Sequence, residues 1–239
     1  MDEKLDKLRS FVSGSGNIVF FGGAGVSTES GIPDFRSKDG LYNMQYEYPP
    51  ETILSSSFFM SNTSEFYRFY RDKLIFTNAK PNPAHAALAK LEESGKLKAV
   101  ITQNIDGLHS AAGSKNVIEL HGSLHRNYCL DCNKSYSLDF MLQTEGIPLC
   151  SCGGIIRPDV VLFGESLNEA VMLNAVSSIS QADMLIIGGT SLMVYPAAAF
   201  IDYYNGDKLV LINMSQTPHD YKADLVIHRS IGEVLESVS

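Results

Sequence analysis

Apolar positions along the chain repeat with two different periods, and these periods predict the secondary structure. Leu5, Leu8 and Val12 recur at helical spacing within residues 2–13, so we expect the chain to open with an amphipathic helix. The apolar run that follows, over residues 17–21, is typical of a buried strand. Later runs predict strands over residues 99–101, 117–120, 159–163, 184–187, 209–212 and 225–227, and helices over residues 65–76, 84–95, 168–181, 195–200 and from 231 onward.

Strands and helices alternate in this pattern, which predicts an α/β fold with a doubly wound parallel sheet. Two stretches interrupt the alternation. We expect both to belong to a smaller inserted domain, with a helical module at residues 41–79 and a cysteine-containing module at residues 123–156. The large domain would then consist of residues 1–40, 80–122 and 157–239.

Length and charge narrow the possible classes of function. The 239 residues, 44% of them hydrophobic, suffice for one large domain with an insertion. The net charge of −8 argues against a general affinity for nucleic acid or for anionic membranes. The N-terminus lacks the basic and apolar regions of a signal peptide, and no run approaches the roughly 18 apolar residues of a membrane span. We therefore expect a cytoplasmic protein, and the lack of a long coiled coil or tail favours a monomer.

All four cysteines fall in one short stretch, as two close pairs. Cys129 and Cys132 form the first pair, Cys150 and Cys152 form the second, and seventeen residues separate the pairs. In a reducing compartment this clustering favours metal over disulfides or a redox pair. Four thiolates match the tetrahedral preference of Zn²⁺ and leave no open position, so the zinc is predicted to be structural.

A glycine-rich turn over residues 22–31 follows the first strand. A strand that runs into such a turn lets backbone N–H groups approach a pyrophosphate. The ordinary dinucleotide fingerprint would place a third glycine at Thr28 and an acidic residue about twenty positions further on, and both are missing. A tight strand–helix connection is therefore an equal alternative. Beside the turn, Phe35 and Arg36 could contact a ligand, or form a buried ring and a structural Asp34–Arg36 pair.

Polar side chains also follow two of the later strands. Asn104 and Asp106 come after the run at residues 99–101, and His121 comes after the run at residues 117–120. Because parallel strands deliver the residues at their carboxyl ends to one edge, we expect these three side chains to lie together. An amide, a carboxylate and an imidazole gathered there predict acid–base chemistry on a bound molecule.

Six motifs, taken in order, resemble the signature of the sirtuins, the NAD-dependent protein-lysine deacylases. The resemblance covers residues from about 17 to 213. Its motifs are Gly23-Ala24-Gly25-Val26-Ser27 through Ser30-Gly31-Ile32-Pro33-Asp34-Phe35-Arg36, Thr102-Gln103-Asn104-Ile105-Asp106-Gly107-Leu108-His109, His121-Gly122, the two cysteine pairs, Val160-Val161-Leu162-Phe163-Gly164-Glu165, and Gly189-Thr190-Ser191. It implies a Rossmann-like large domain, a small domain with a helical module and a zinc ribbon, and a cleft where NAD meets an acyl-lysine peptide.

The resemblance also implies contacts to both reactants. The resemblance implies that Ala24, Ser27, Thr28 and Arg36 lie at the phosphates and adjoining ribose of NAD, and that Phe35 covers the nicotinamide ribose. It implies that Gln103 and Asn104 contact the ribose next to the reacting carbon, and that Ile105 and Asp106 hold the carboxamide. The residues that it implies around the adenosine half are Thr190, Ser191, Asn213 and Ile231. The substrate lysine would lie between Val160 and Phe163, and the peptide would pair with the backbone there as an added strand.

His121 and Asn104 are the expected catalytic residues. By the resemblance, the acyl oxygen attacks the nicotinamide ribose, and His121 acts as general base, a role worth roughly 10²–10⁴ in rate. The products would be deacylated lysine, nicotinamide and O-acetyl-ADP-ribose, so NAD is a consumed co-substrate. We expect acetylated-lysine proteins as partners, because no Tyr-x-x-Arg motif for acidic acyl groups occurs within residues 38–60.

Three other functions remain open at this point. Protein mono-ADP-ribosyl transfer would use the same activated ribose with another nucleophile. An NAD-binding dehydrogenase would instead reduce the cofactor, and a zinc-ribbon adaptor would bind nucleic acid, against the acidic charge balance. We assign no catalytic role to His109 or His125, and we expect Glu165 to be a local hydrogen-bonding residue rather than a second base.

Overall fold

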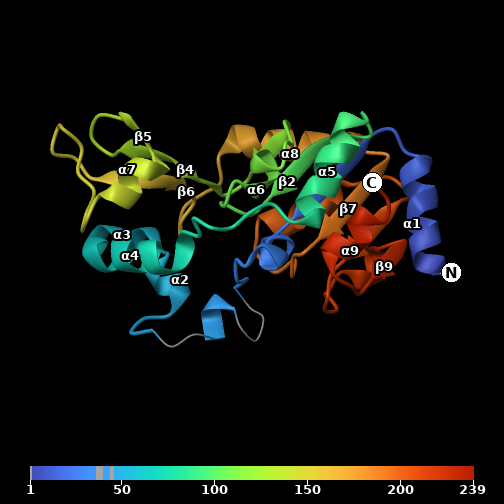
Figure 1. Ribbon diagram of the computed structural model, residues 1–239, viewed down its shortest axis with the longest axis horizontal. Coiled ribbons are helices and arrows are strands. Elements are labelled where there is room, and N and C mark those ends of the chain that lie inside the picture. Colours follow the sequence, from blue (N-terminus) through green and yellow to red (C-terminus); the bar gives the residue numbers. More distant parts are fainter. Residues whose placement is uncertain (1, 36–39, 44–45) are drawn as a thin grey trace.

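The computed structural model describes residues 2–35, 40–43 and 46–239, and its centre is a six-stranded sheet. Every neighbouring pair in this sheet is parallel, and the strand order is β3-β2-β1-β7-β8-β9. The predicted parallel sheet is therefore confirmed (Figure 1). Its strands are β1 (Ile18–Gly22), β2 (Leu97–Thr102), β3 (Val117–Glu119), β7 (Met184–Gly188), β8 (Leu209–Ile212) and β9 (Leu225–Ile227).

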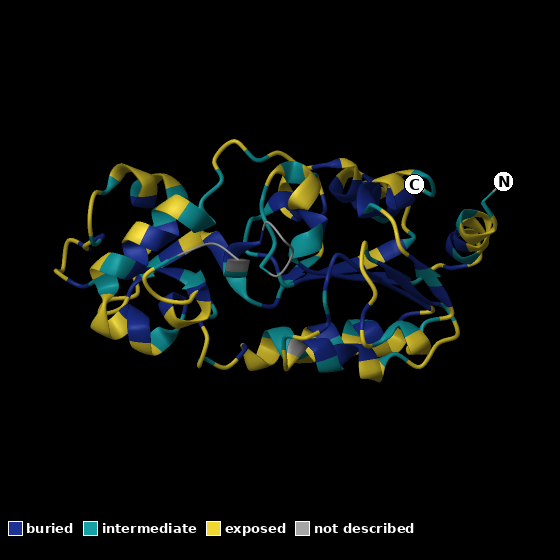
Figure 2. Ribbon diagram, turned by 90° about the horizontal axis from the view of Figure 1, so that it is seen from below, coloured by how far each residue is buried: buried dark blue, intermediate teal, exposed yellow. Residues whose placement is uncertain are grey.

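Helices cover both faces of this sheet, so the fold has three layers (Figure 2). Successive strand residues face opposite sides, and accordingly Phe20 packs into one apolar core and Phe21 into the other. One face carries α1 (Glu3–Ser13), α5 (Pro83–Glu93) and α9 (Ile231–Glu236), and the other carries α8 (Glu169–Gln181) and the 3₁₀ helix η5 (Ala197–Tyr203). Burial on both faces explains why the strands are continuous apolar runs rather than alternating ones.

The start of α5 is tied to the glycine-rich turn. Asn82 caps the helix, because its side chain accepts hydrogen bonds from the backbone N–H groups of Ala84 and His85, and His85 Nδ1 accepts from the Asn82 N–H in return. The Asn82 side-chain amide also donates to the carbonyl of Val26, 2.7 Å away. One buried cap therefore begins the helix and fixes the turn that follows β1.

A second sheet and a group of short helices pack together as one smaller unit. Three strands form an antiparallel sheet of order β5-β4-β6, and short helices share an aromatic core with it. The helical pattern over residues 65–76 buries its aromatic face, as predicted, in a helix that continues into a π-helical turn. The elements are β4 (Gly122–Cys129), β5 (Ser135–Ser137), β6 (Ile156–Val160), α2 (Pro50–Ile53), α3 (Ser56–Ser61), α4 (Thr63–Phe69), η4 (Tyr70–Leu74) and α7 (Leu138–Gln143).

The strand predicted over residues 159–163 was assigned to the wrong sheet. The strand observed there is β6, which lies antiparallel to β4 with Val160 opposite Gly122. An apolar run of this length suits either sheet, and only the pairing partner decides between them. The helix predicted over residues 195–200 is instead the 3₁₀ helix η5. The remaining elements are η1 (Ala24–Val26), η2 (Thr28–Ser30), η3 (Leu41–Asn43), α6 (Leu108–Ala111) and η6 (Asp220–Lys222).

Candidate active site

The candidate site lies where the strand order reverses. β1 pairs with β2 on one side and β7 on the other, and its last residue, Gly22, is level with Thr102 and Gly188. The turns after these three strands therefore leave the sheet at the same edge. In open α/β sheets a ligand binds at such a reversal point, outside the carboxyl ends of the strands.

The turns after β1 and β7 come into direct backbone contact. The N–H of Gly25 donates to the carbonyl of Gly189 at 2.7 Å. A Cβ on Gly25 would lie 2.8 Å from the Gly189 Cα, and Gly189 itself has φ of +58°, so both positions require glycine. Next to this contact Ala24 is half-buried, and Thr28 is exposed with its hydroxyl donating to the carbonyl of Gly25.

Three polar side chains form a connected network at the same edge. The Ser27 hydroxyl donates to Asp106 Oδ2 at 2.7 Å and accepts from the Asn104 amide at 3.0 Å. The other carboxylate oxygen of Asp106 accepts from the N–H of Leu108 at 2.9 Å. Ser27 and Asn104 are buried, at 1% and 9% exposure. The carboxylate of Asp106 is therefore held in one orientation, a link between the two motifs that sequence spacing gave no sign of.

His121 is held in one tautomer. Its Nδ1 lies 2.9 Å from the carbonyl oxygen of Gln103, which can only accept, so Nδ1 carries the proton and the lone pair lies on Nε2. Burial lowers the pKa of His121 below its ordinary value, and the hydrogen bond to Gln103 offsets this only partly. The ring is therefore neutral at neutral pH, which is the state that a general base needs.

The other residues predicted to contact NAD differ in how deeply they are buried. Gln103 donates to the hydroxyl of the buried Thr190 at 3.3 Å. Ser191 and Asn213, which follow β7 and β8, are half-buried, whereas Ile231 is only 4% exposed and fills the apolar core beside Gly188.

Three further predicted positions lie nearer the small unit or outside the described residues. Phe35 and Ile105 are half-buried against the aromatic core of the small unit. Arg36 lies outside the described residues.

The two residues predicted to flank the substrate differ in exposure. Val160 is 7% exposed and packs into the small unit's core, whereas Phe163 is 42% exposed. Between them, the N–H of Val161 donates to the carbonyl of His121 at 3.0 Å. The segment that carries both residues is thus attached directly to the backbone of the candidate base.

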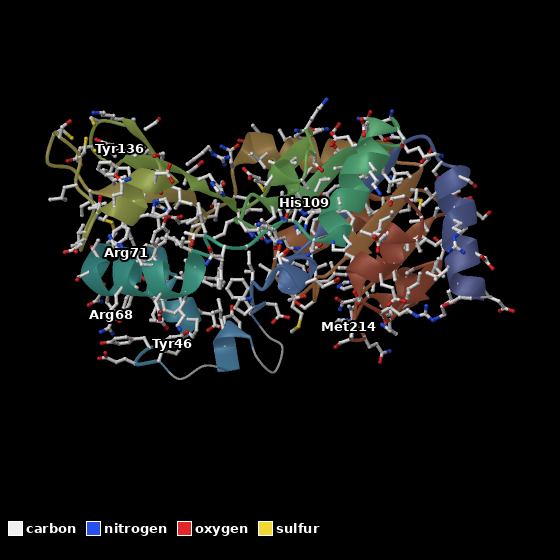
Figure 3. All side chains as sticks on the ribbon, viewed as in Figure 1. Tyr46, Arg68, Arg71, His109, Tyr136 and Met214 are labelled. Carbon is white, nitrogen blue, oxygen red and sulfur yellow. The ribbon has the colours of Figure 1, made fainter. Side chains whose placement is uncertain are left out.

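The four cysteines converge as a tetrahedral metal site requires. Their Sγ atoms all lie within 4.8 Å of one another, and three of the contacts measure 3.5–3.6 Å. A tetrahedron with Zn–S bonds of about 2.3 Å has edges of about 3.8 Å, so the cluster has the right size for zinc. No disulfide joins these cysteines. The hydroxyl of Tyr136 donates to Cys150 Sγ at 3.0 Å, and Tyr136 marks this end of the molecule in Figure 3.

Three other ionisable residues near the site make structural contacts. His109 is 2% exposed and packs against the ring of His85, and burial lowers the pKa of His109 to about 3 (Figure 3). His125 Nε2 lies 3.0 Å from the carbonyl oxygen of Asp106. Glu165 accepts hydrogen bonds from Arg157 and from a backbone N–H, so the predicted local bonding role is confirmed.

Together, the fold and the site define a class of protein. The large unit is a Rossmann-like sheet, and the turns after β1, β2 and β7 meet where its strand order reverses. The small unit contains four cysteines arranged as a zinc site requires. Comparison with known proteins narrows this class: residues 23–196 match the model of the Sir2 family. The chain belongs to this family.

Curated relatives are similar in sequence to almost the whole chain. A protein of Clostridium acetobutylicum named NAD-dependent protein deacetylase is 60% identical over 240 residues, covering 99% of this chain and 98% of its own length. A protein of Clostridium perfringens with the same name is 60% identical over 242 residues, covering 100% of this chain and 99% of its own length.

Solved structures agree with the fold. A chain from a study of the mechanism and regulation of Sir2 enzymes superimposes with a TM-score of 0.90 at 40% identity, covering 100% of this chain and 97% of its own. A Sir2 with a p53 peptide and NAD⁺ gives a TM-score of 0.88 at 42% identity, covering 98% of this chain and 97% of its own. In the part of the chain that the structure describes, no helix combines the length and the apolar character needed to cross a membrane.

Proposed function

We propose that this chain is an NAD-dependent protein-lysine deacetylase, which consumes NAD as a co-substrate. The observation that carries the proposal is His121, a neutral imidazole with its Nε2 lone pair free, at the ligand edge of the sheet. The segment proposed to hold the substrate, from Val160 to Phe163, is hydrogen-bonded to the backbone carbonyl of His121 through the N–H of Val161. The names of the relatives at 60% identity, and Sir2 structures with acetylated peptide or with NAD⁺, support the same activity.

The dinucleotide would extend along the ligand edge. The turn at residues 23–28 would hold the phosphates, because its glycines let backbone N–H groups approach closely. Asp106 and Ile105 would hold the carboxamide of nicotinamide, and the fixed orientation of the Asp106 carboxylate supports this role. The proposed adenosine contacts are Thr190, Ser191, Asn213 and Ile231, and Phe35 and Arg36 would lie at the nicotinamide half and phosphates.

The chemistry follows from the base and the sugar. The acyl oxygen of the substrate attacks the ribose carbon as nicotinamide leaves, with Gln103 and Asn104 contacting that ribose. His121 Nε2 then accepts a proton from the ribose hydroxyls, so that the 2′-oxygen attacks the imidate carbon. Addition of water releases deacylated lysine and O-acetyl-ADP-ribose. A positioned base of this kind contributes roughly 10²–10⁴ in rate.

The organisation of the chain forms part of the proposal. Residues 1–40, 80–122 and 157–239 would bind NAD, and residues 41–79 and 123–156 would form the small domain; their separate apolar cores support this division. Substrates would be proteins with acetyl-lysine or other uncharged acyl groups. The net charge of −8 supports a protein that does not bind nucleic acid. A monomeric state and a cytoplasmic location stay predictions.

A nicotinamide-release assay tests the activity. We expect release to depend on an acetylated peptide, together with the mass loss in the peptide that corresponds to replacing the acetyl group by hydrogen. His121→Ala should lower turnover by about 10²–10⁴ and leave binding of NAD and peptide largely unchanged. His219→Ala, which alters a histidine outside the proposed contacts to NAD and peptide, is the matched control and should keep full activity.

Other outcomes would identify a different enzyme. Transfer of ADP-ribose to protein without loss of acetyl would indicate a mono-ADP-ribosyltransferase. Accumulation of reduced cofactor without free nicotinamide would indicate a dehydrogenase. Substantial deacylation by His121→Ala would remove this residue from the base role.

A further inference from the structure

The segment from Val160 to Glu165 leads from β6, in the small sheet, toward α8 of the large unit, and beyond Val160 it has no regular secondary structure. It turns at Gly164, where φ is +90°. Phe163, which is proposed to flank the substrate lysine, is exposed on this segment. A segment without a strand or helix of its own needs other contacts to hold one conformation.

Backbone hydrogen bonds anchor the segment at both sides. Val161 donates to the carbonyl of His121, as described above. On the other side, Phe163 donates to the carbonyl of Leu54 at 2.9 Å and accepts from the N–H of Ser56 at 3.0 Å. The segment therefore lies between the candidate base and the helical module, and its shape determines the distance between them.

An ion pair holds the segment from within. Arg157 Nη1 and Nη2 lie 2.7 and 3.0 Å from the two carboxylate oxygens of Glu165, a bidentate arrangement. Arg157 Nη2 also donates to the carbonyl of Val160 at 2.8 Å, and Glu165 Oε2 accepts from the N–H of Leu162 at 2.9 Å. The pair thus binds the backbone at the beginning and in the middle of the segment that it closes.

This pair is sheltered and remains charged. The Arg157 and Glu165 side chains are 11% and 26% exposed, and the guanidinium lies 5.5 Å from the centroid of the Phe59 ring. Burial alone would raise the pKa of Glu165, but the hydrogen bonds from Arg157 and Leu162 outweigh it and lower that pKa. A sheltered ion pair contributes little net stability compared with apolar residues of the same volume, so stability alone does not account for it.

We infer that Arg157 and Glu165 are positioning residues that clasp the segment 160–165 and so set the place of the acyl-lysine relative to His121. The inference rests on the proposed function, because it concerns the same substrate site. Removing the carboxylate charge loosens the carbonyl and N–H contacts, and Phe163 then loses its fixed place. A displacement of about 1 Å can cost as much as 100-fold in rate, so an effect on peptide use is measurable.

The test compares the kinetics of peptide and NAD in Glu165→Gln, which keeps the shape of the side chain but removes its charge. We expect the KM for an acetylated peptide to rise about tenfold, while the KM for NAD stays within about twofold. A fluorescent acetyl-lysine peptide should lose affinity by a similar factor in anisotropy measurements. Glu65→Gln is the matched control, because Glu65 pairs with Arg68 in the same small unit without touching the segment, and it should change none of these constants.

Several outcomes overturn the inference. An unchanged peptide KM and affinity in Glu165→Gln would do so, and so would equal losses for peptide and NAD accompanied by a lower melting temperature. If Glu165→Gln does not fold, the test uses Arg157→Lys, which keeps the charge but not the bidentate geometry. This variant must show the same selective loss of peptide affinity. If neither variant folds, the pair has a purely structural role and the inference is wrong. A wild-type protein that releases no nicotinamide with peptide refutes the proposed function instead, and this result does not depend on the variants.

Discussion

At the scale of single residues, one hydrogen bond decides the chemistry of His121. The carbonyl of Gln103 accepts a hydrogen bond from the Nδ1–H of His121, which leaves Nε2 as the basic atom. The same residue, Gln103, belongs to the motif that contains Asn104 and Asp106, so the candidate base and the proposed nicotinamide contact are held by one backbone segment. Ser27, in the turn after β1, is hydrogen-bonded to the side chains of both Asn104 and Asp106.

The pH dependence of the reaction follows from this environment. Because burial lowers the pKa of His121, the ring loses its proton below the ordinary histidine value of about 6.5. We expect kcat/KM for the peptide to be constant near neutral pH and to fall on acidification only below about pH 6.5. A pH–rate profile of nicotinamide release measures this fall in kcat/KM. A fall centred above pH 7 would contradict the role of His121.

At the scale of elements, the cysteine cluster joins separate parts of the small antiparallel sheet. Cys129 ends β4, and Cys150 lies in the turn that leads to β6, so the four thiolates connect the ends of strands whose own sheet has only three members. The Tyr136 hydroxyl adds a hydrogen bond to Cys150 from β5. A structural zinc would add to the stability that the sheet gains from the aromatic core it shares with the short helices.

Replacing a buried ligand should remove the metal and the fold of this unit together. We expect Cys129→Ser to lose its zinc and to unfold at a lower temperature, because binding and folding are coupled in such sites. Elemental analysis and calorimetry measure the two effects, with Ser135→Ala, on the exposed edge strand β5, as the control. A folded, active Cys129→Ser protein without zinc would refute the structural assignment.

At the scale of the whole molecule, two segments distant in sequence meet and share one aromatic core. Residues of α2 to α4 pack against β4, β6 and α7, and the small unit connects to the parallel sheet through β4 and β6 (Figure 1). Because β4 begins at Gly122, directly after His121, the candidate base lies at the junction of the two sheets. This position suits the proposed role of His121, in which NAD and the peptide meet between the two parts.

Acid should weaken the whole fold through His109, whose folded pKa is about 3 against about 6.5 for an unfolded chain. Between these values the unfolded chain binds the extra proton, so stability falls as the pH falls, by up to about 1.4 kcal/mol per pH unit. Urea unfolding at pH 7 and pH 5 should therefore show a smaller loss for His109→Leu than for wild type. Leu88→Ala, a core change without a titrating group, should lower stability equally at both values; an identical pH dependence in His109→Leu and wild type would contradict the prediction.

Much of this protein follows from local sequence alone. Apolar periodicity predicts β1, β2, β7 and most helices, because a buried strand and an amphipathic helix each impose their own spacing on the chain. The cysteine spacing likewise predicts the zinc site, since four thiolates this close have few other arrangements. Only the tertiary structure decided which sheet β6 joins, that Ser27 bonds to Asp106, and that Arg157 clasps Glu165. The physical reason is that strand pairing and side-chain hydrogen bonds are chosen by partners distant in sequence, and local patterns carry no information about those partners.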